Sequence, residues 1–184
     1  MQQEAPQVNL ILIGEPSVGK SSLFLSWKNP ADNFAEFYLP TISHDFSQQP
    51  YEASGKQYEL HIYDASGLEN YIYMYKPHLE KADGVIVMFD VTNKESFTKA
   101  LKWIQLAKET AKGDTEYLLV GSKTDLEAER QMKHEEAAEF AKTHGLNYVE
   151  ISTKNKTNLK AVQDDLVPRA IKVHEKRASE GAIA

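Results

Sequence analysis

Cysteine is absent from the 184 residues of this chain. Its absence excludes a disulfide framework, a zinc site with cysteine ligands and a thiol nucleophile. It also leaves the chain without a residue that could be prenylated or palmitoylated. We therefore expect no lipid anchor in the sequence as it stands: either a lipid-bearing tail was removed, or the protein does not anchor itself by lipid.

Long apolar runs and an excess of basic residues are missing as well. No segment approaches the roughly 20 consecutive apolar residues of a membrane span. No basic region precedes the first apolar run, which argues against a signal peptide. Acidic residues outnumber basic ones, 27 against 21, which argues against a nucleic-acid-binding protein. These absences favour a cytoplasmic protein that reaches membranes only through partners or a missing tail.

The composition instead predicts one globular domain. A chain of 184 residues has an ordinary length for a single domain. Apolar residues make up 41% of the chain and charged residues 26%, a balance that excludes disorder throughout.

Short apolar runs alternate with helical patterns along the chain, which predicts an α/β fold with a mostly parallel sheet. Each apolar run is followed by Gly, Asp or Ser, and both faces of each run are largely apolar, as in buried parallel strands. The predicted strands are Val8–Ile13, Tyr58–Tyr63, Val85–Phe89, Tyr117–Val120 and Tyr148–Ile151. The predicted helices are Ser22–Trp27, Glu95–Thr110, His134–His144 and Leu159–Lys176.

Two residues and two segments depart from this simple alternation. Gly145 is expected to end the third helix, and Pro168 should kink the last one. Residues 34–53 and 66–77 show neither the apolar spacing of a strand nor that of a helix, and long connections of this kind often carry function.

A phosphate-binding loop is the clearest motif. Residues 14–21 read GEPSVGKS and match GxxxxGK[ST] between a predicted strand and a predicted helix. The glycines let successive N–H groups face one anion, the lysine reaches the β- and γ-phosphates, and the serine hydroxyl meets Mg²⁺. The predicted phosphate-binding residues are Gly14, Glu15, Pro16, Ser17, Val18, Gly19, Lys20, Ser21 and Ser22.

A base-binding motif follows the strand that ends at Val120. Ser122-Lys123-Thr124-Asp125 is similar to the [N/T]KxD signature of guanine binding. The Asp125 carboxylate can accept from N1–H and from the exocyclic amine of guanine, a pair of donors that adenine lacks. The aliphatic stem of Lys123 would cover one face of the purine. Ser152-Thr153-Lys154 follows a later strand and would offer a backbone N–H to guanine O6.

In this order the motifs resemble those of small GTPases of the Ras superfamily, and within it the Rab-like members. The resemblance covers about residues 8–176, with an N-terminal extension (1–7) and a C-terminal tail (177–184) outside it. It implies a P-loop G domain with about six mostly parallel strands and helices on both faces. It also implies GTP and GDP as ligands, Mg²⁺ as cofactor, and protein effectors, exchange factors and activating proteins as partners.

The resemblance also assigns roles in two switch segments. In the first, Phe34 would pack against guanine, Tyr38 opens the segment YLPTI, and Thr41 would bind Mg²⁺ and the γ-phosphate. In the second, Asp64 would hold Mg²⁺ through a water, and the N–H of Gly67 would sense the γ-phosphate. Metal-ligand roles therefore fall to Ser21, Thr41 and Asp64.

Leu68 departs from the family pattern where chemistry matters most. It stands in place of the glutamine that orients the attacking water, and leucine has no donor or acceptor. Lys20, Thr41 and Gly67 keep the other predicted catalytic roles. We expect slow or absent GTP hydrolysis, and the alternative to a slow enzyme is a nucleotide-locked, non-hydrolysing binding module or a subunit of a larger trafficking complex.

Two further substitutions accompany it. Pro16 occupies a loop position that is small in many relatives, and Ser122 replaces the usual asparagine. We expect the shorter serine to lose contacts to the base and to the P-loop. Effector contacts are expected in the second switch at the aromatic residues Tyr71, Tyr73 and Tyr75, because exposed aromatics are enriched at interfaces. The resemblance to Rab proteins, in which an aromatic triad contacts effectors, further implies contacts at Phe46, Tyr63 and His78.

Overall fold

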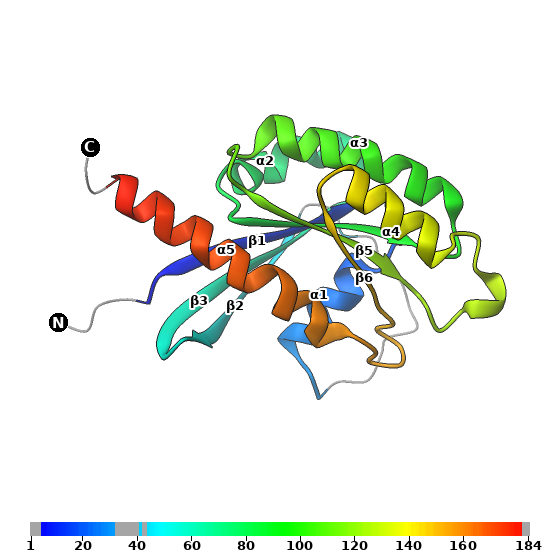
Figure 1. Ribbon diagram of the computed structural model, residues 1–184, viewed down its shortest axis with the longest axis horizontal. Coiled ribbons are helices and arrows are strands. Elements are labelled where there is room, and N and C mark those ends of the chain that lie inside the picture. Colours follow the sequence, from blue (N-terminus) through cyan, green and yellow to red (C-terminus); the bar gives the residue numbers. More distant parts are fainter. Residues whose placement is uncertain (1–4, 32–40, 42–43, 182–184) are drawn as a thin grey trace.

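The computed structural model describes residues 5–31, 41 and 44–181. A single sheet runs through the middle of the molecule, with its strands in the order β2-β3-β1-β4-β5-β6 (Figure 1). Every neighbouring pair is parallel except β2 and β3, which form an antiparallel hairpin. The strands are β1 (Gln7–Gly14), β2 (His44–Ala53), β3 (Lys56–Ala65), β4 (Gly84–Asp90), β5 (Glu116–Ser122) and β6 (Asn147–Glu150).

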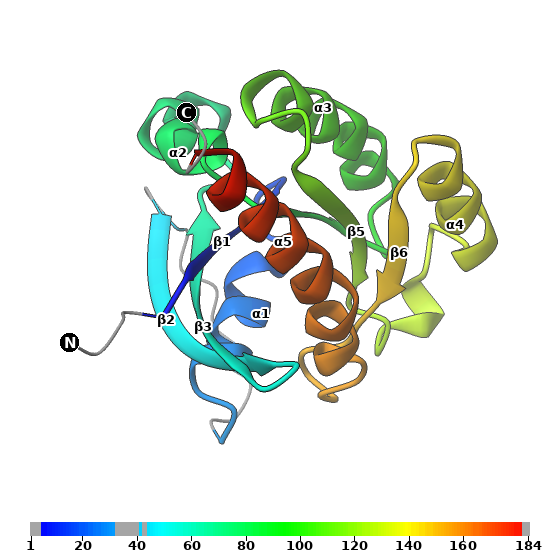
Figure 2. The same cartoon turned by 60° about the vertical axis from the view of Figure 1, so that its left-hand side comes forward.

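Helices cover both faces of this sheet (Figure 2). The buried residues of α1 and α5 form one apolar cluster with one face of the sheet. Those of α2, α3 and α4 form a second cluster with the opposite face. The helices are α1 (Lys20–Lys28), α2 (Ile72–Glu80), α3 (Lys94–Thr110), α4 (His134–Thr143) and α5 (Leu159–Gly181), with short 3₁₀ turns at Glu69–Tyr71 and Glu127–Glu129.

Strand β1 shows why the apolar runs are continuous. Successive side chains of a strand point to opposite faces, and both faces of this sheet are covered. Leu10 and Leu12 pack in the α1/α5 cluster, whereas Ile11 and Ile13 pack in the α2/α3/α4 cluster. The predicted α/β fold, with a six-stranded, mostly parallel sheet and helices on both faces, is therefore confirmed.

Sequence analysis did not predict two elements, because neither has buried apolar residues at the regular spacing of a strand or a helix. β2 lies inside the stretch predicted as a loop, and as an edge strand it buries only the side chain of Ser47. α2 overlaps the second predicted loop; it buries only Tyr75 and Leu79 and contains Pro77.

The last helix differs from its prediction in length. It remains helical on both sides of Pro168 and continues to Gly181, so the predicted boundary after residue 176 falls inside α5. Gly145 has a positive φ of 69° directly after the last turn of α4, as expected of a residue that ends a helix. In the part of the chain that the structure describes, no helix is long and apolar enough to cross a membrane.

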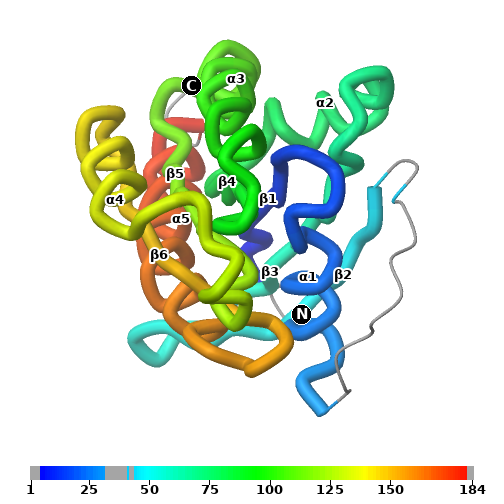
Figure 3. Tube along the Cα trace, turned by 90° about the vertical axis from the view of Figure 1, so that its right-hand side faces the viewer, coloured from blue at the N-terminus to red at the C-terminus, as the bar shows by residue number. Residues whose placement is uncertain are grey.

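The topology brings the predicted motifs to one edge of the sheet. β1, β3, β5 and β6 are all parallel, so the loops that follow them emerge on the same side. These loops carry the P-loop, the DxxG-like element, the SKTD segment and the STK turn, respectively. The tube in Figure 3 shows the P-loop between β1 and α1 at this edge.

Candidate nucleotide and magnesium site

The P-loop has a backbone conformation that depends on its two motif glycines, Gly14 and Gly19. Gly14 adopts φ 141°, and a Cβ there would lie 2.3 Å from the carbonyl oxygen of Met88. Gly19, at φ 93°, precedes α1 and has no side chain with which to cap it. The N–H groups of the first turn of α1 therefore remain available, and a helix N-terminus of this kind binds anions.

Lys20 is held inside the P-loop. Its Nζ donates to the carbonyl oxygens of Gly14 and Glu15 at 2.9 and 2.7 Å. The residue is only 5% exposed. Burial lowers the pKa of Lys20 to about 8, because the ammonium has lost most of its contact with water. A phosphate group at this place would supply the missing negative charge.

Ser21, Thr41 and Asp64 converge beside Lys20, as their predicted metal roles require. The Ser21 hydroxyl donates to Asp64 Oδ2 at 2.5 Å and lies 2.9 Å from the hydroxyl oxygen of Thr41. Asp64 is fully buried, and its Oδ1 has no hydrogen-bond partner among the described residues. Burial raises the pKa of Asp64 to about 6.

This set of oxygens fits Mg²⁺. Hard divalent cations prefer hydroxyl and carboxylate oxygens, and the unpartnered Oδ1 is the kind of atom that a bound ion or its water would satisfy. Within the described ranges no group of three His, Cys, Asp or Glu side chains could hold a metal. A magnesium site here depends on the hydroxyls of Ser21 and Thr41 together with Asp64.

The second switch begins in contact with the P-loop. A Cβ on Gly67 would lie 2.4 Å from the backbone nitrogen of Pro16 and 2.6 Å from the carbonyl carbon of Glu15. Only glycine allows the two backbones to approach so closely. Leu68 follows immediately; its N–H donates to the Ser66 hydroxyl at 3.3 Å, and the residue is 42% exposed. An exposed apolar side chain therefore directly follows the glycine that contacts the P-loop.

The two base motifs also meet. The Ser152 hydroxyl donates to Asp125 Oδ1 at 2.6 Å, and the Thr124 N–H donates to the carbonyl oxygen of Ile151 at 3.2 Å. Asp125 thus has one carboxylate oxygen fixed by the STK turn. In that turn Thr153 is half-buried and Lys154 is exposed.

Ser122 links the base motif to the P-loop. It is buried, and its hydroxyl lies 2.5 Å from the carbonyl oxygen of Val18 and 3.0 Å from that of Phe89. The short side chain therefore keeps a contact with the P-loop, and the expected loss of contacts relative to asparagine stays a prediction. Serine reaches Val18 because β5 and the P-loop lie close together at this end of the sheet.

The remaining predicted residues occupy different surroundings. Ser17 is exposed with a positive φ of 63°, Ser22 is half-buried in the first turn of α1, and Val18 packs in the apolar core. Because the Val18 side chain is buried, Val18 could contact a phosphate only through its backbone. Phe34 and Tyr38 lie outside the described residues.

Sequence reasoning missed several residues that support the site. The Glu15 carboxylate accepts from Trp103 Nε1 at 2.9 Å and from Lys99 Nζ at 3.0 Å, which ties the P-loop to α3. Asp90 pairs with Lys123 at 2.6 Å. The available signal for Asp90 was its place at the end of a fully buried parallel strand, at the edge where the other motifs emerge.

The predicted effector residues lie in different surroundings, and Tyr71 is half-buried. Tyr63 stacks on His78 with ring centroids 4.1 Å apart, and Phe46 lies 5.0 Å from Tyr63, so these three rings form one row across β2, β3 and α2. Tyr73 is 70% exposed, whereas Tyr75 is fully buried against the sheet. The prediction of an effector contact is thus wrong for Tyr75, because its face of α2 packs inward.

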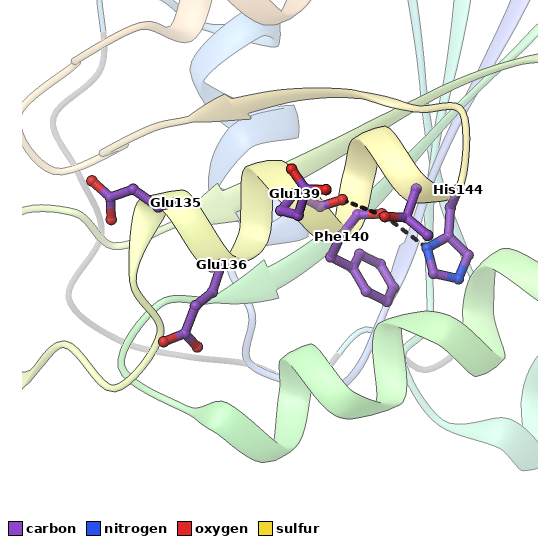
Figure 4. Close-up of a pocket in the computed structure, with 6 residues that line it drawn as sticks. Glu135, Glu136, Glu139, Phe140 and His144 are labelled. Carbon is purple, nitrogen blue, oxygen red and sulfur yellow. Dashed lines mark hydrogen bonds between the residues drawn. The ribbon is translucent and has the colours of Figure 1, made fainter.

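A hollow on α4 is separate from these motifs. Figure 4 shows its carboxylate side chains pointing in different directions, with the Phe140 ring lying on the side of the neighbouring helix. The Thr143 hydroxyl and the His144 Nδ1 bond to carbonyl oxygens of α4 itself. Its lining residues are Glu135, Glu136, Glu139, Phe140, Thr143 and His144.

Comparisons with known proteins agree with the geometry. Residues 9–172 match the model of the Ras family. The chain is 35% identical over 175 residues to the GTP-binding protein YPTM2 of Zea mays, an alignment that covers 95% of this chain and 84% of that protein. It is 34% identical to the Ras-related protein RABD2a of Arabidopsis thaliana (94% and 83% covered). It is also 34% identical to the Ras-related protein Rab-13 of Canis lupus familiaris (82% and 73% covered).

Proposed function

Because the chain belongs to the Ras family of small GTPases, we propose that it is a Rab-like switch in intracellular membrane traffic that hydrolyses GTP slowly. Membership of the family supports GTP binding. The roles of individual residues, the slow GTP hydrolysis and the place in vesicle traffic are our proposal. The observation that best supports this proposal is that Lys20, Ser21, Thr41 and Asp64 meet at the P-loop, where one carboxylate oxygen of Asp64 lacks a hydrogen-bond partner among the described residues.

Each of these residues has a task in phosphoryl transfer. Lys20 and the P-loop N–H groups stabilise the negative charge that spreads over the phosphate oxygens as water attacks in line. Ser21, Thr41 and Asp64 would hold Mg²⁺, which supplies further positive charge at the phosphates. The N–H of Gly67 would bond to the γ-phosphate and so report whether that phosphate is present.

Leu68 supports slow hydrolysis. Its side chain contains only carbon and hydrogen, so it offers no polar atom to position water, and it is 42% exposed directly after Gly67, which contacts the P-loop. GTP binding and GTP hydrolysis should therefore separate in this protein. The same observation favours a second candidate, a nucleotide-locked module whose ordered switches serve as a docking surface.

Single-turnover hydrolysis tests this proposal. We expect Leu68→Gln to increase phosphate release from GTP-loaded protein by about tenfold or more, since tenfold corresponds to only about 1.4 kcal/mol of barrier. GTP affinity should remain nearly unchanged. Leu25→Gln is the matched control, because Leu25 is 45% exposed on α1 and has no proposed role.

The outcomes separate the two candidates. An unsubstituted protein that hydrolyses GTP rapidly would contradict both. No increase with Leu68→Gln would mean that Pro16 or an arginine from a partner limits the rate. The nucleotide released on denaturation of the purified protein adds a second readout: GDP supports the slow enzyme, and GTP supports the locked module.

A further inference from the structure

A buried carboxylate lies between the two halves of the candidate site. Asp90 ends β4, which is flanked by β1 with the P-loop and by β5 with the base motif. It is 6% exposed and pairs in register with Ser122, the first residue of the base motif. Buried carboxylates are rare unless they are paired, so its partners indicate what it does.

Three contacts fix Asp90 in place. Its Oδ1 accepts from the N–H of Thr92 at 2.8 Å and from the Thr92 hydroxyl at 2.7 Å. Its own N–H donates to the Ser96 hydroxyl at 3.0 Å, at the start of α3. The carboxylate is therefore rigid, and its second oxygen remains for another partner.

That partner is Lys123. The Nζ of Lys123 lies 2.6 Å from Asp90 Oδ2, and the lysine side chain is 35% exposed while that of Asp90 is 9% exposed. Lys123 itself has a positive φ of 64°, an unusual conformation for a non-glycine residue, which directs its side chain from the loop after β5. A long flexible side chain is thus held at its tip by a fixed, poorly hydrated charge.

We propose that Asp90 is a positioning residue for the guanine base. By holding the Lys123 ammonium, it fixes the aliphatic stem in the place where the purine stacks, before nucleotide arrives. Ordering a free lysine costs conformational entropy, and a side chain ordered in advance avoids that cost on binding. This inference rests on the proposed base site at Lys123 and Asp125.

A purely structural role for Asp90 makes a different prediction. If Asp90 only shapes the turn between β4 and α3, its importance lies in the bonds to Thr92 and not in the pair with Lys123. Thr92→Val is a matched control, because it removes the hydroxyl bond to Oδ1 and leaves the ion pair intact. Asp90→Asn does the reverse: it retains an oxygen for Thr92 and removes the charge.

The experiment is a double-mutant cycle on nucleotide release. The dissociation rate of a fluorescent GDP analogue is measured with Mg²⁺ for the full chain and for Asp90→Asn, Lys123→Met, their combination and Thr92→Val. We expect Asp90→Asn to accelerate release about tenfold, equivalent to about 1.4 kcal/mol. Adding Asp90→Asn to the Lys123→Met variant should cause no further acceleration. Thr92→Val should lower the melting temperature and leave release unchanged.

Several results would overturn the inference. Equal acceleration by Asp90→Asn with and without Lys123, or acceleration by Thr92→Val, would assign Asp90 to the turn. Acceleration by Lys123→Met without acceleration by Asp90→Asn would refute the positioning role and leave the base site standing. No effect of Lys123→Met would refute the base site and this inference together. Asp90→Ser, which also retains an oxygen near Thr92, repeats the cycle if Asp90→Asn does not fold.

Discussion

At the residue scale, we predict that Asp125 determines which nucleotide binds. Its Oδ1 is occupied by the Ser152 hydroxyl, so the orientation of the carboxylate is set before a base arrives. A carboxylate fixed in this way can accept from both guanine donors, and the loss of a matched polar partner in a buried site is strongly unfavourable.

Asp125→Asn should therefore weaken GTP binding at least tenfold and admit xanthine nucleotides, whose C2 carbonyl accepts from the new amide. Competition binding with GTP, XTP and ATP against a fluorescent GDP analogue measures this. Ser22→Ala is a suitable control because Ser22 lies at the phosphate end of the site. Equal affinity of the unsubstituted protein for ATP and GTP would refute the base assignment.

Asp64 makes stability depend on pH when metal is absent. Burial raises its pKa from the ordinary 3.8 of an aspartate to about 6, so between these values the folded protein holds a proton that the unfolded chain has released. The free energy of unfolding should therefore fall as pH rises through this window, by on the order of 3 kcal/mol. Below pH 4 the contribution is fully present.

Urea denaturation of metal-free, nucleotide-free protein at pH 4.5 and 6.5 measures this slope. Asp64→Asn, which cannot ionise, should remove the fall that Asp64 causes, so the comparison cancels the other carboxylates. Added Mg²⁺ should oppose the fall, since it binds the ionised carboxylate. Identical pH dependence in the two proteins would contradict the raised pKa.

At the element scale, the end of α5 is tied to the sheet by Arg177. The guanidinium donates to the carbonyl oxygen of Ala82 at 3.0 Å and to Asp83 Oδ1 at 2.9 Å, and it pairs with Asp114. Asp83 is buried, and its other oxygen accepts from the N–H of Asn9 on β1 at 2.9 Å. The last turns of α5 thus neutralise a charge in the core.

Arg177→Met should lower the free energy of unfolding by about 3 kcal/mol, because Asp83 would remain buried without the guanidinium. Lys176→Met is the matched control: the Lys176 side chain is 59% exposed and should contribute well under 1 kcal/mol. Urea denaturation of GDP-loaded protein compares the two. Equal effects would show that the buried pair contributes no more than a surface pair.

At the scale of the whole molecule, we expect switching to depend on a contact between two distant segments. Gly67 lies against the backbone of Glu15 and Pro16, and α2 follows it within a few residues. A γ-phosphate bound at the P-loop would add a hydrogen bond to this junction, and binding that orders a segment slows its local opening.

Hydrogen exchange should therefore be slower in α2 (Ile72–Glu80) with a non-hydrolysable GTP analogue than with GDP. α4 (His134–Thr143), which packs at the far edge of the sheet, should exchange equally in both states and serves as an internal control. Ser21→Asn, which disturbs the proposed metal site, should reduce the difference. The same α2 protection in both nucleotide states would contradict a switch.

Local patterns in the sequence were sufficient for much of this protein. The P-loop, the SKTD segment and the STK turn are short runs with fixed spacing, and each follows an apolar strand long enough to identify. Because buried parallel strands read as continuous apolar runs, the five parallel strands β1, β3, β4, β5 and β6 and four of the five helices could also be predicted. The meeting of Ser21 and Asp64 followed from the family resemblance, and the distances between them agree with it.

Tertiary structure alone decided the features that depend on which surfaces are covered and which distant residues meet. The edge strand β2 and the short helix α2 have too few buried positions to show a period, so only their neighbours define them. The burial of Tyr75, the Ser122 contact with Val18 and the pairing of Asp90 with Lys123 join segments far apart in the chain. No spacing along the sequence encodes such distances, because they arise when strands pack side by side and bring their ends to one edge of the sheet.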